Sequence, residues 1–537
     1  MNAPDTAEQL WQIAHQRVRL GQSIVQSLAQ AGPQSCTQLM RQKASAWPEA
    51  IALVHRERSM SYAQMFERMD RARQALHDRG VRAGQSVALL MNNSDQYVLW
   101  YFAVLGLGAV AVPLNNRLVP TEAAYILRHS QAVLLITEPT YAETVDALAK
   151  NHDMAIATVT LSPDSIECEL AATAMSAEPP LQADAPAALY YTSGTTGQPK
   201  GVVHTHASLN ADSLQSPSAW EYDFAGVRSL AITPLFHIAA HTIFFPVLFE
   251  GGTLVIDTYE TQATLALLER QSINAFFAVP SILLLMVDKA GSLGITLPGV
   301  RTVMFGAAPM TISRLDDVQR LFPNAALVHG MGQTESGGTL VTLPSVAAKA
   351  RAGSVGLAMA GVEVAIVDEQ DRRVPAGQVG ELVARGPNLM RGYLHNETAT
   401  QETLRHGWLH TGDLGFQDEE GLVTLVDRKK DMIIRGGENI YSCEVEQVLM
   451  RHPAIQGAAV VGQRDAIFGE QVAAFLVANP ALPRPDEAAL REHCRQALAD
   501  FKIPVTLRFI EGMPLTATGK VRKTELRDSL PAYERRS

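Results

Sequence analysis

Short apolar segments alternate with amphipathic segments along this chain from about residue 50 onward. The apolar segments are rich in valine, leucine and isoleucine, and clear examples are residues 51–54, 86–90, 133–136 and 254–256. Between them, residues 62–77 and 121–129 carry apolar side chains at the three- and four-residue spacing of a helix that buries one face. This alternation of strands and helices predicts an α/β fold with layered, largely parallel sheets.

Residues 360–427 change the pattern to short strands separated by glycine and aspartate turns, which predicts a smaller β-rich subdomain. A charged stretch at residues 427–431 follows, and the pattern of residues 442–498 after it is that of a self-contained α+β module. Such a connector is typical of a domain boundary, although a surface turn inside one domain would have the same composition. The first 30 residues predict a mildly amphipathic helix.

Composition and charge exclude several classes of protein. A length of 537 residues exceeds what one compact core accommodates, so two or more domains are expected. The net charge of -10 argues against a nucleic-acid-binding surface, which needs a basic field. The four cysteines are scattered without a CxxC pair, so we expect reduced thiols and a cytoplasmic protein.

The most apolar run, residues 100–114, is too short to span a bilayer and contains Gly106, Gly108 and Pro113. A buried helix that leads into a strand explains this run better than a membrane span does. The first 30 residues also lack the order of basic and apolar residues that marks a signal peptide. We therefore expect no transmembrane segment.

One loop carries the strongest chemical signal of the sequence. Residues 191–201 read YTSGTTGQPKG and follow residues 187–190, which are expected to end a strand. Glycines let the backbone approach a ligand, hydroxyls and backbone amides donate hydrogen bonds to phosphate oxygens, and Lys200 adds positive charge. The segment does not satisfy the GxxxxGK[ST] pattern of a Walker A loop. The residues alone leave a phosphate-binding loop and a plain surface loop as equal alternatives.

The string resembles, residue for residue, the signature loop of the class I adenylate-forming superfamily, which includes acyl-CoA synthetases, firefly luciferase and adenylation domains of peptide synthetases. Segments similar to the family's other motifs follow in the family's order, within roughly residues 40–525. They are PLFH at 234–237, FGAAP at 305–309, GMGQTE at 330–335, WLHTGD at 408–413, DR at 427–428, GGENIY at 436–441 and PLTATGK at 514–520.

The resemblance implies a division of the chain into parts that move relative to one another. A large N-terminal domain would combine layered α/β subdomains with a β-rich subdomain, and a small α+β domain would act as a mobile lid. We expect a helical extension at residues 1–35, the large AMP-binding domain at 36–427, a hinge at 428–430 and the lid domain at 431–537.

The resemblance also implies a nucleotide site built from several motifs. Asp413 and Arg428 would contact the ribose. Met331 stands where the family usually has an aromatic residue against the adenine, and a polarizable methionine can also pack on a flat ring. The residues expected to bind ATP or AMP are Thr192, Ser193, Gly194, Thr195, Thr196, Gly197, Lys200, Gly306, Ala307, Ala308, Gly330, Met331, Gly332, Gln333, Asp413 and Arg428.

Four catalytic residues follow from the same resemblance. Thr334 would hydrogen-bond the α-phosphate, Glu335 would hold Mg²⁺, and His237 would line and gate the carboxylate pocket. Lys520 would bridge the carboxylate and the α-phosphate during adenylation, a role that suits a mobile point charge. Outside these motifs, a histidine such as His237 is more often a core residue, and a lysine near a glycine is more often a surface residue.

Two further assignments concern the transfer to coenzyme A. Lys430 falls on the family's hinge, although a pair of lysines is otherwise most often a solvated face. Gly436 and Gly437 lie in the segment similar to the family's pantetheine tunnel, and Phe501 lies where the family contacts the nucleotide of coenzyme A. Ser442 stands in place of the family's usual proline, a change that we expect to be structural and minor.

The acid-binding pocket is expected to be apolar. Its candidate residues are Phe236, Ala239, Ala240, His241 and Phe277. No Lys, Arg, Asp or Glu occurs in the segments that hold them, which disfavours a charged or amino-acid substrate because a buried charge needs a partner. Small alanines leave room for more than acetate. We therefore expect a medium-chain fatty acid or an aryl or arylpropenoic acid.

Together these features predict an ATP-dependent acyl-CoA ligase that forms an acyl-adenylate, releases pyrophosphate and passes the acyl group to coenzyme A. The expected ligands are ATP, CoA, Mg²⁺ and a small carboxylic acid, no nucleic acid is expected, and a homodimer is an open alternative to a monomer. A stand-alone adenylating enzyme that loads a carrier protein would use the same motifs. A luciferase-like oxygenase and a non-catalytic adenylate-binding protein are further alternatives, and the intact Glu335, Asp413 and Lys520 argue against the last.

Overall fold

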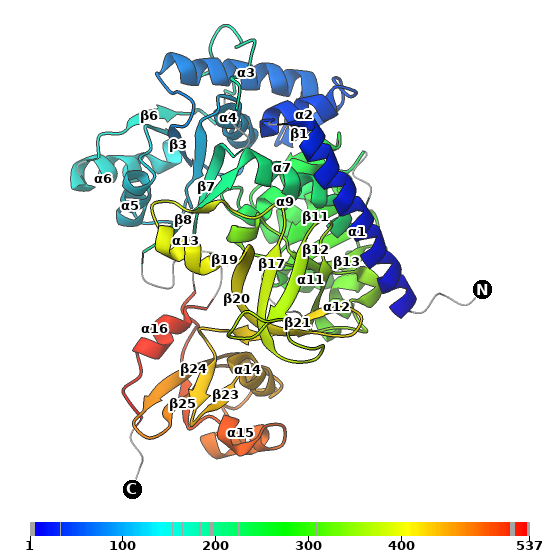
Figure 1. Ribbon diagram of the computed structural model, residues 1–537, viewed down its shortest axis with the longest axis vertical. Helices are drawn as coiled ribbons and strands as arrows, with labels where there is room; N and C mark the ends of the chain where they lie inside the picture. The colour runs from blue at the N-terminus through cyan, green and yellow to red at the C-terminus, as the bar shows by residue number, and fades with distance from the viewer. Residues whose placement is uncertain are drawn as a thin grey trace. The chain divides into compact units, whose positions relative to one another are not determined.

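The structure is a computed structural model (Figure 1), and the chain forms two compact units. It describes residues 6–32, 34–152, 154–163, 165–181, 184–192, 198–222, 226–306, 310, 312–515 and 521–533. The larger unit comprises Met1–Ala365, Val383–His410 and Asp418–Val423, and the smaller unit comprises Ile366–Leu382, Thr411–Gln417 and Thr424–Ser537. Among the described residues, none of the helices combines the length and the hydropathy of a membrane span.

A seven-stranded sheet in the larger unit carries the segment YTSGTTGQPKG. Its strand order is β18-β8-β7-β4-β3-β5-β6, in which the last five strands run parallel and β8 runs antiparallel to β7. The strands are β3 (Ser86–Leu90), β4 (Val110–Pro113), β5 (Leu134–Thr137), β6 (Ala157–Thr160), β7 (Pro186–Thr192), β8 (Lys200–Thr205) and β18 (Gly392–Tyr393). The strands predicted near residues 86–90, 133–136 and 187–190 are therefore confirmed.

The apolar run at residues 100–114 is a buried helix followed by a strand, as predicted. Helix α4 (Asp95–Gly106) begins where the Ser94 side chain accepts a hydrogen bond from the backbone N–H of Tyr97, an N-cap. Every residue of α4 is buried, which explains why the sequence shows no polar face there. After Gly108 turns the chain with a φ of 72°, β4 begins.

A second sheet in the larger unit carries the strands that end at the other motifs. Its order there is β15-β14-β13-β12-β11-β9-β10-β1-β2, and the strands from β13 to β1 are parallel. They are β1 (Ile51–His55), β2 (Arg58–Ser61), β9 (Arg228–Ala231), β10 (Thr253–Ile256), β11 (Ala275–Ala278), β12 (Thr302–Gly306), β13 (Ala326–Met331), β14 (Val341–Leu343) and β15 (Ser354–Ala358).

The strand order of this sheet reverses beside β9. The chain adds β10 on one side of β9 and then crosses back to add β11, β12 and β13 on the other side. Open α/β sheets bind ligands at such a reversal, beyond the carboxyl ends of the strands. The segments that follow β9, β11, β12 and β13 are therefore the ones positioned to form a site.

Helices connect and cover these strands in the larger unit (Figure 1). The predicted helices at residues 62–77 and 121–129 are α3 (Tyr62–Asp78) and α5 (Pro120–His129). Ser61 and Gln64 form a capping box at the start of α3. The remaining helices of eight or more residues are α2 (Cys36–Ala44), α6 (Ala142–His152), α7 (His206–Gln215), α9 (Ile238–Phe249), α10 (Thr261–Arg270), α11 (Pro280–Leu293) and α12 (Ile312–Leu321), and the shorter ones include α8 (Pro217–Trp220) and α13 (Glu397–Thr403).

The predicted N-terminal helix is α1 (Thr6–Ala31), and it packs along the larger unit. Its buried Arg17 donates hydrogen bonds to the carbonyl of Leu357 on β15 and, at 2.6 Å, to the hydroxyl of Thr342 on β14. Gly21 lies so close to Gly361 that an added Cβ would stand 2.2 Å from the Gly361 nitrogen. Glycine at position 21 therefore allows the helix backbone to approach the larger unit directly.

The β-rich region predicted at residues 360–427 is present. It contains β16 (Glu363–Val367), β17 (Gly380–Arg385), β20 (Trp408–Gln417) and β21 (Val423–Arg428), which follow one another as hydrogen-bonded neighbours in that order. The division between the two units runs through these four strands.

The rest of the smaller unit is the predicted α+β module. A sheet of β23-β22-β25-β24, with β26 beside β25, packs against α14 (Ser442–Met450) and α15 (Glu487–Arg495). Its strands are β22 (Ile433–Arg435), β23 (Glu438–Ile440), β24 (Ile455–Asp465), β25 (Gly469–Ala478) and β26 (Thr506–Phe509), and α16 (Lys523–Asp528) follows. The predicted α/β class, with a β-rich region and a separate C-terminal α+β part, is confirmed.

Candidate active site

The predicted phosphate loop joins two antiparallel strands. Thr192 ends β7 and Lys200 begins β8, and the two residues are register partners. The two residues that flank the loop therefore lie side by side. The Lys200 ammonium lies 4.8 Å from the centre of the Tyr393 ring. Tyr393 comes to this place because β18 pairs with β8 through Gly392 and Tyr393. Five residues of the loop, Ser193, Gly194, Thr195, Thr196 and Gly197, lie outside the described residues.

Glycines bring the ends of β12 and β13 and the following turn into backbone contact. Gly306 and Gly330 are register partners, and a Cβ on Gly306 would stand 2.2 Å from the Gly330 carbonyl oxygen. A Cβ on Gly332 would stand 1.7 Å from the Gly338 oxygen. No side chain fits at Gly306 or Gly332 without a shift of the backbone, which is a physical reason for the second glycine of the GMGQTE segment. Ala307 and Ala308 lie outside the described residues.

The predicted catalytic pair Thr334 and Glu335 lies in a single turn, η2 (Thr334–Ser336), whose backbone is held from three directions. The carbonyl of Thr334 lies 2.7 Å from the His204 Nε2. The Glu335 carbonyl accepts a 2.8 Å hydrogen bond from the backbone N–H of Met390. The Ser336 carbonyl accepts one, also 2.8 Å, from the Asn388 side-chain amide. Three successive carbonyl groups are thus fixed by two other segments, β8 and residues 388–390, which leaves the backbone of this turn little freedom.

The Glu335 side chain is positioned by a residue that the sequence analysis missed. The Tyr393 hydroxyl donates a 2.8 Å hydrogen bond to the Glu335 Oε1. Burial, together with the nearby Glu335 carboxylate, raises the pKa of the Tyr393 phenol well above its usual value, so the hydroxyl remains a donor at physiological pH. Tyr393 and Glu335 are 58 positions apart in the sequence. Tyr393 directly follows an Arg-Gly pair, and this local sequence does not indicate a contact with Glu335.

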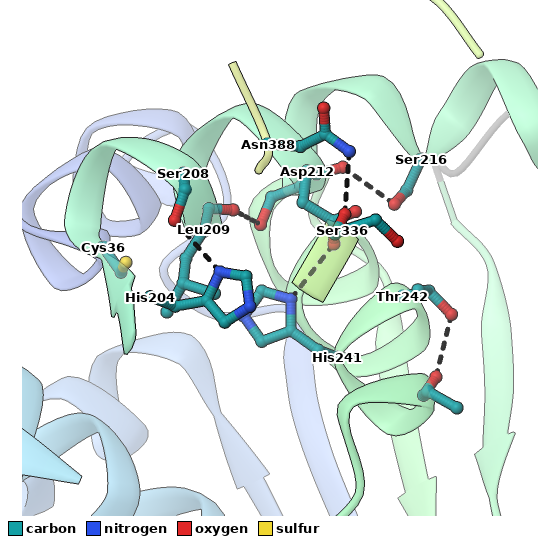
Figure 2. A network of polar contacts seen from close by, with 12 residues as sticks. Cys36, His204, Ser208, Leu209, Asp212, Ser216, His241, Thr242, Ser336 and Asn388 are labelled. Carbon is teal, nitrogen blue, oxygen red and sulfur yellow. Dashed lines mark hydrogen bonds and ion pairs between the residues drawn. The ribbon is translucent and has the colours of Figure 1, made fainter. Parts of the chain in front are cut away.

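Behind the turn lies a buried polar network, in which two residues of α7 face two histidines (Figure 2). Ser208 lies 3.2 Å from the His204 Nδ1, and the Asp212 Oδ2 lies 3.2 Å from the His241 Nδ1. A carbonyl oxygen can only accept, so the Nε2 of His204 carries the proton that bonds to Thr334. Burial lowers the pKa of His204 to about 4, which keeps the ring neutral near pH 7.

His241, a predicted pocket residue, is fully buried in this network and packs against Phe245, with ring centroids 3.6 Å apart. Burial lowers the pKa of His241 to about 3 and raises that of Asp212 well above its usual value. Both shifts favour the uncharged forms, as expected for polar groups removed from water.

The segment PLFH follows β9 at the reversal of strand order. His237 caps α9, and its Nδ1 accepts a 3.1 Å hydrogen bond from the backbone N–H of Ala239. An imidazole that accepts a hydrogen bond through Nδ1 carries its proton on Nε2. Phe236 and Ala240 are buried beside it, and Ala239 is half-buried.

Phe277 comes from the neighbouring strand β11 and reaches the same region as the glycine contact. Its ring lies 3.7 Å from the position of a Cβ built on Gly306. The carboxyl ends of β11 and β12 therefore bring an aromatic side chain next to the backbone of Gly306 and Gly330. Met331 and Gln333, which belong to the GMGQTE segment, are half-buried.

In the smaller unit, the two residues expected to contact ribose lie together. The Arg428 Nε lies 2.6 Å from the Asp413 Oδ1. The backbone N–H of Asp413 donates a hydrogen bond to the Thr411 hydroxyl at 3.1 Å, which fixes the strand at this point. Lys430, the expected hinge residue, is exposed in the turn that follows β21.

The residues expected to bind coenzyme A are brought near one another by Arg435. Gly436 and Gly437 form a two-residue hairpin turn between β22 and β23, with φ angles of 60° and 89° that favour glycine. The backbone N–H of Gly436 donates to the Phe468 carbonyl, and Arg435 donates a 2.9 Å hydrogen bond to the Phe501 carbonyl. Lys520 lies outside the described residues.

The family models and relatives that match this chain identify it as an AMP-forming acid–thiol ligase. The chain belongs to the AMP-binding enzyme family, which matches residues 40–394, and its C-terminal part matches the AMP-binding enzyme C-terminal domain over residues 444–520. The predicted family and the predicted reaction, ATP-dependent acyl-CoA ligation through an acyl-adenylate, are confirmed.

Relatives named as CoA ligases or synthases match nearly the whole chain. A feruloyl-CoA synthase from Amycolatopsis sp is 35% identical, covering 89% of this chain and 96% of its own. A long-chain-fatty-acid–CoA ligase from Mycobacterium tuberculosis is 34% identical, covering 92% and 98%. The solved structure of o-succinylbenzoate CoA synthetase from Bacillus subtilis with its acyl-adenylate intermediate has a TM-score of 0.81 and 29% identity, covering 93% and 99%.

Proposed function

We propose that the acid activated by this ligase is a medium-sized apolar acid, either an arylpropenoic or other aryl acid or a medium-chain fatty acid. The observation that carries the proposal is the reversal of strand order beside β9. It brings the PLFH segment and Phe277 to adjacent carboxyl ends, next to the strands that end at Gly306 and Gly330. An acid held between them would have its carboxylate near the nucleotide segments.

The side chains available for this pocket support an uncharged acyl group. Phe236, Ala239, Ala240 and Phe277 are apolar, and the segments 235–249 and 275–280 contain no Lys, Arg, Asp or Glu. Burying an unpaired neutral polar group costs about 2–7 kcal/mol, and burying a second carboxylate without a cationic partner would cost more. A dicarboxylic acid is therefore disfavoured relative to a monocarboxylic one.

The named relatives include enzymes for aryl and fatty acids. One is a feruloyl-CoA synthase and another acts on long-chain fatty acids, whereas further relatives are 2-succinylbenzoate–CoA ligases. The absence of cationic residues from the two pocket segments favours the first two kinds of acyl group over the third.

We propose that Mg²⁺ is held by Glu335 together with the phosphates of ATP. Glu335 is a half-buried carboxylate that, within the described part of the chain, accepts one hydrogen bond, from Tyr393, so lone pairs remain suitable for a hard cation. Mg²⁺ commonly binds one or two carboxylates plus substrate phosphates, so one acidic residue fits. When bound, the ion would neutralise phosphate charge as the acid's carboxylate approaches.

The remaining assignments complete this proposal. The phosphate-loop residues with Lys200, the segments at Gly306 and Gly330, and the Asp413–Arg428 pair would bind ATP and AMP. Thr334 would orient the α-phosphate, the Nε2–H of His237 would face the acid, and Lys520 would stabilise the adenylation transition state. The predicted lid domain, residues 431–537, would turn about Lys430 to admit CoA along Gly436, Gly437 and Phe501. The cytoplasm stays the expected location, and the oligomeric state stays open between monomer and homodimer.

A panel of acids tests the substrate class. Pyrophosphate release and CoA-thioester formation would be measured with ferulic acid, octanoic acid, hexadecanoic acid, 2-succinylbenzoic acid, acetic acid and an α-amino acid. We expect the highest kcat/KM with ferulic or octanoic acid. Best turnover on 2-succinylbenzoate, acetate or an amino acid would overturn the apolar pocket, and turnover only with a carrier-protein thiol would contradict the choice of CoA.

A further inference from the structure

The backbone of the turn that holds Thr334 and Glu335 is rigid. A rigid backbone alone does not fix the side chain of Glu335. His204, Met390 and Asn388 fix its three carbonyl groups. The carboxylate of Glu335 still projects on two methylene groups with three rotatable bonds. A side chain of this length loses rotamer entropy whenever it is ordered around a ligand. A catalytic carboxylate therefore benefits from a partner that selects its rotamer before the ligand arrives.

Tyr393 is placed to be that partner, and it contacts the predicted Mg²⁺ ligand and a predicted phosphate-binding lysine at once. Its hydroxyl donates the 2.8 Å hydrogen bond to the Glu335 Oε1. The face of its ring lies 4.8 Å from the Lys200 ammonium, within the range of a cation–π interaction. Tyr393 is itself fixed, because its backbone N–H donates a 2.9 Å hydrogen bond to the Thr400 hydroxyl and its strand pairs with β8.

We propose that Tyr393 is a positioning residue for adenylation, which orients the Glu335 carboxylate for Mg²⁺ and holds the Lys200 ammonium beside the phosphate loop. The inference rests on the proposed function of Glu335 as the Mg²⁺ ligand. Through its two ends, Tyr393 joins the start of β8 to the turn after β13, two segments of different sheets. Loss of a partner that orients a metal ligand typically lowers metal affinity or activity by about 10–100-fold.

The substitution Tyr393→Phe removes one oxygen atom and keeps the ring, so it separates the two contacts. ATP–pyrophosphate exchange would be measured against free Mg²⁺ at fixed ATP, with thermal unfolding as the measure of folding. We expect the Mg²⁺ concentration for half-maximal exchange to rise about tenfold, the lower end of the effect of losing such a partner. At saturating Mg²⁺ the variant should approach the wild-type rate, because the ligand itself is retained.

The substitution Tyr393→Leu also removes the ring. Besides the rise in the Mg²⁺ requirement, it should raise the KM for MgATP, because the Lys200 ammonium loses its aromatic partner. Equal KM values for MgATP in the Phe and Leu variants would overturn the part of the proposal that concerns Lys200.

Tyr141→Phe is the matched control. Tyr141 is half-buried in the larger unit, and its hydroxyl likewise donates one hydrogen bond to a side-chain oxygen, that of Asn92 at 2.7 Å. It should leave the Mg²⁺ requirement unchanged. If Tyr393→Phe behaves like this control while Glu335→Gln abolishes exchange, the positioning role of Tyr393 is wrong. If Glu335→Gln keeps the wild-type dependence on Mg²⁺, the assignment of Glu335 itself fails, a distinct result.

Discussion

At the scale of single residues, the larger unit contains buried histidines whose titration should control stability in mild acid. His206, the first residue of α7, is almost completely buried, and its Nδ1 accepts a hydrogen bond from the backbone N–H of Cys36. Protonation of Nδ1 would break this bond and place a charge in an apolar region. Burial accordingly lowers the pKa of His206 to about 4.

The direction of the pH effect follows from proton uptake. An unfolded histidine titrates near pH 6.5, so below that pH the unfolded chain binds a proton that folded His206 does not bind. The stabilisation is complete above the unfolded pKa, and the contribution of His206 to the free energy of unfolding falls by about 1.4 kcal/mol per pH unit as the pH drops from about 6.5 to about 4. We expect His206→Asn, whose amide oxygen can accept the same hydrogen bond, to weaken this dependence, as urea denaturation between about pH 7 and pH 5 would measure. Equal pH slopes for the two proteins would contradict the prediction.

The site residues divide into those that a sequence motif can indicate and those that only the folded chain brings together. Thr334 and Glu335 are adjacent in a motif, and local spacing is enough to single them out. Tyr393 and His204 reach the same turn from 58 and 130 positions away, and no periodicity of the sequence encodes that proximity. The serine that replaces a usual proline is similar: Ser442 is fully buried and its hydroxyl donates a 3.0 Å hydrogen bond to Asp427.

At the scale of elements, the helices and strands that the pattern predicts are present, because each buries a face or a whole segment whose period is visible. The exception in kind is α9. All but one of its residues are buried, so no polar stripe marks it, and its internal Pro246 argues against a continuous helix. The sequence therefore predicts only pocket residues there. By contrast, the Gly-Gly pair at 436–437 is a clear sequence signal for a hairpin turn. That this turn lies near Phe501 follows only from the hydrogen bond between Arg435 and the Phe501 carbonyl.

Helix α1 gives a prediction at this scale. It precedes residue 40, where the match to the family begins, yet Arg17 bonds to Thr342, the register partner of Gly330 at the start of the GMGQTE segment. We expect Arg17→Met to lower the free energy of unfolding by about 1–3 kcal/mol, because buried carbonyl and hydroxyl oxygens lose a charged donor. Arg19→Met, at an exposed position of the same helix, should have almost no effect. Urea denaturation of both variants tests the prediction, and equal losses would show that the Arg17 contacts contribute nothing specific.

At the scale of the whole molecule, two ways of dividing the chain differ over the β-rich strands. Contacts group residues 366–382, 411–417 and 424–428 with the C-terminal part. The family resemblance instead predicts that these strands stay with the large domain and that motion occurs at residues 428–430. The contact-based division describes which residues pack together, whereas a hinge is defined by which dihedral angles change, so only a functional measurement distinguishes the two.

Lys430→Pro provides that measurement. Proline fixes φ near −65° and restricts the residue before it, so a rotation about residue 430 would be blocked while an exposed side chain is lost without cost to the core. We expect ATP–pyrophosphate exchange, which needs one arrangement of the parts, to continue. CoA-thioester formation, which needs the other, should slow by more than about tenfold, corresponding to about 1.4 kcal/mol in the barrier. Lys430→Ala, which keeps a flexible backbone, should retain both activities. Equal loss of both half-reactions would show that residue 430 is not the hinge. The hinge would then be sought in the strands of the β-rich region.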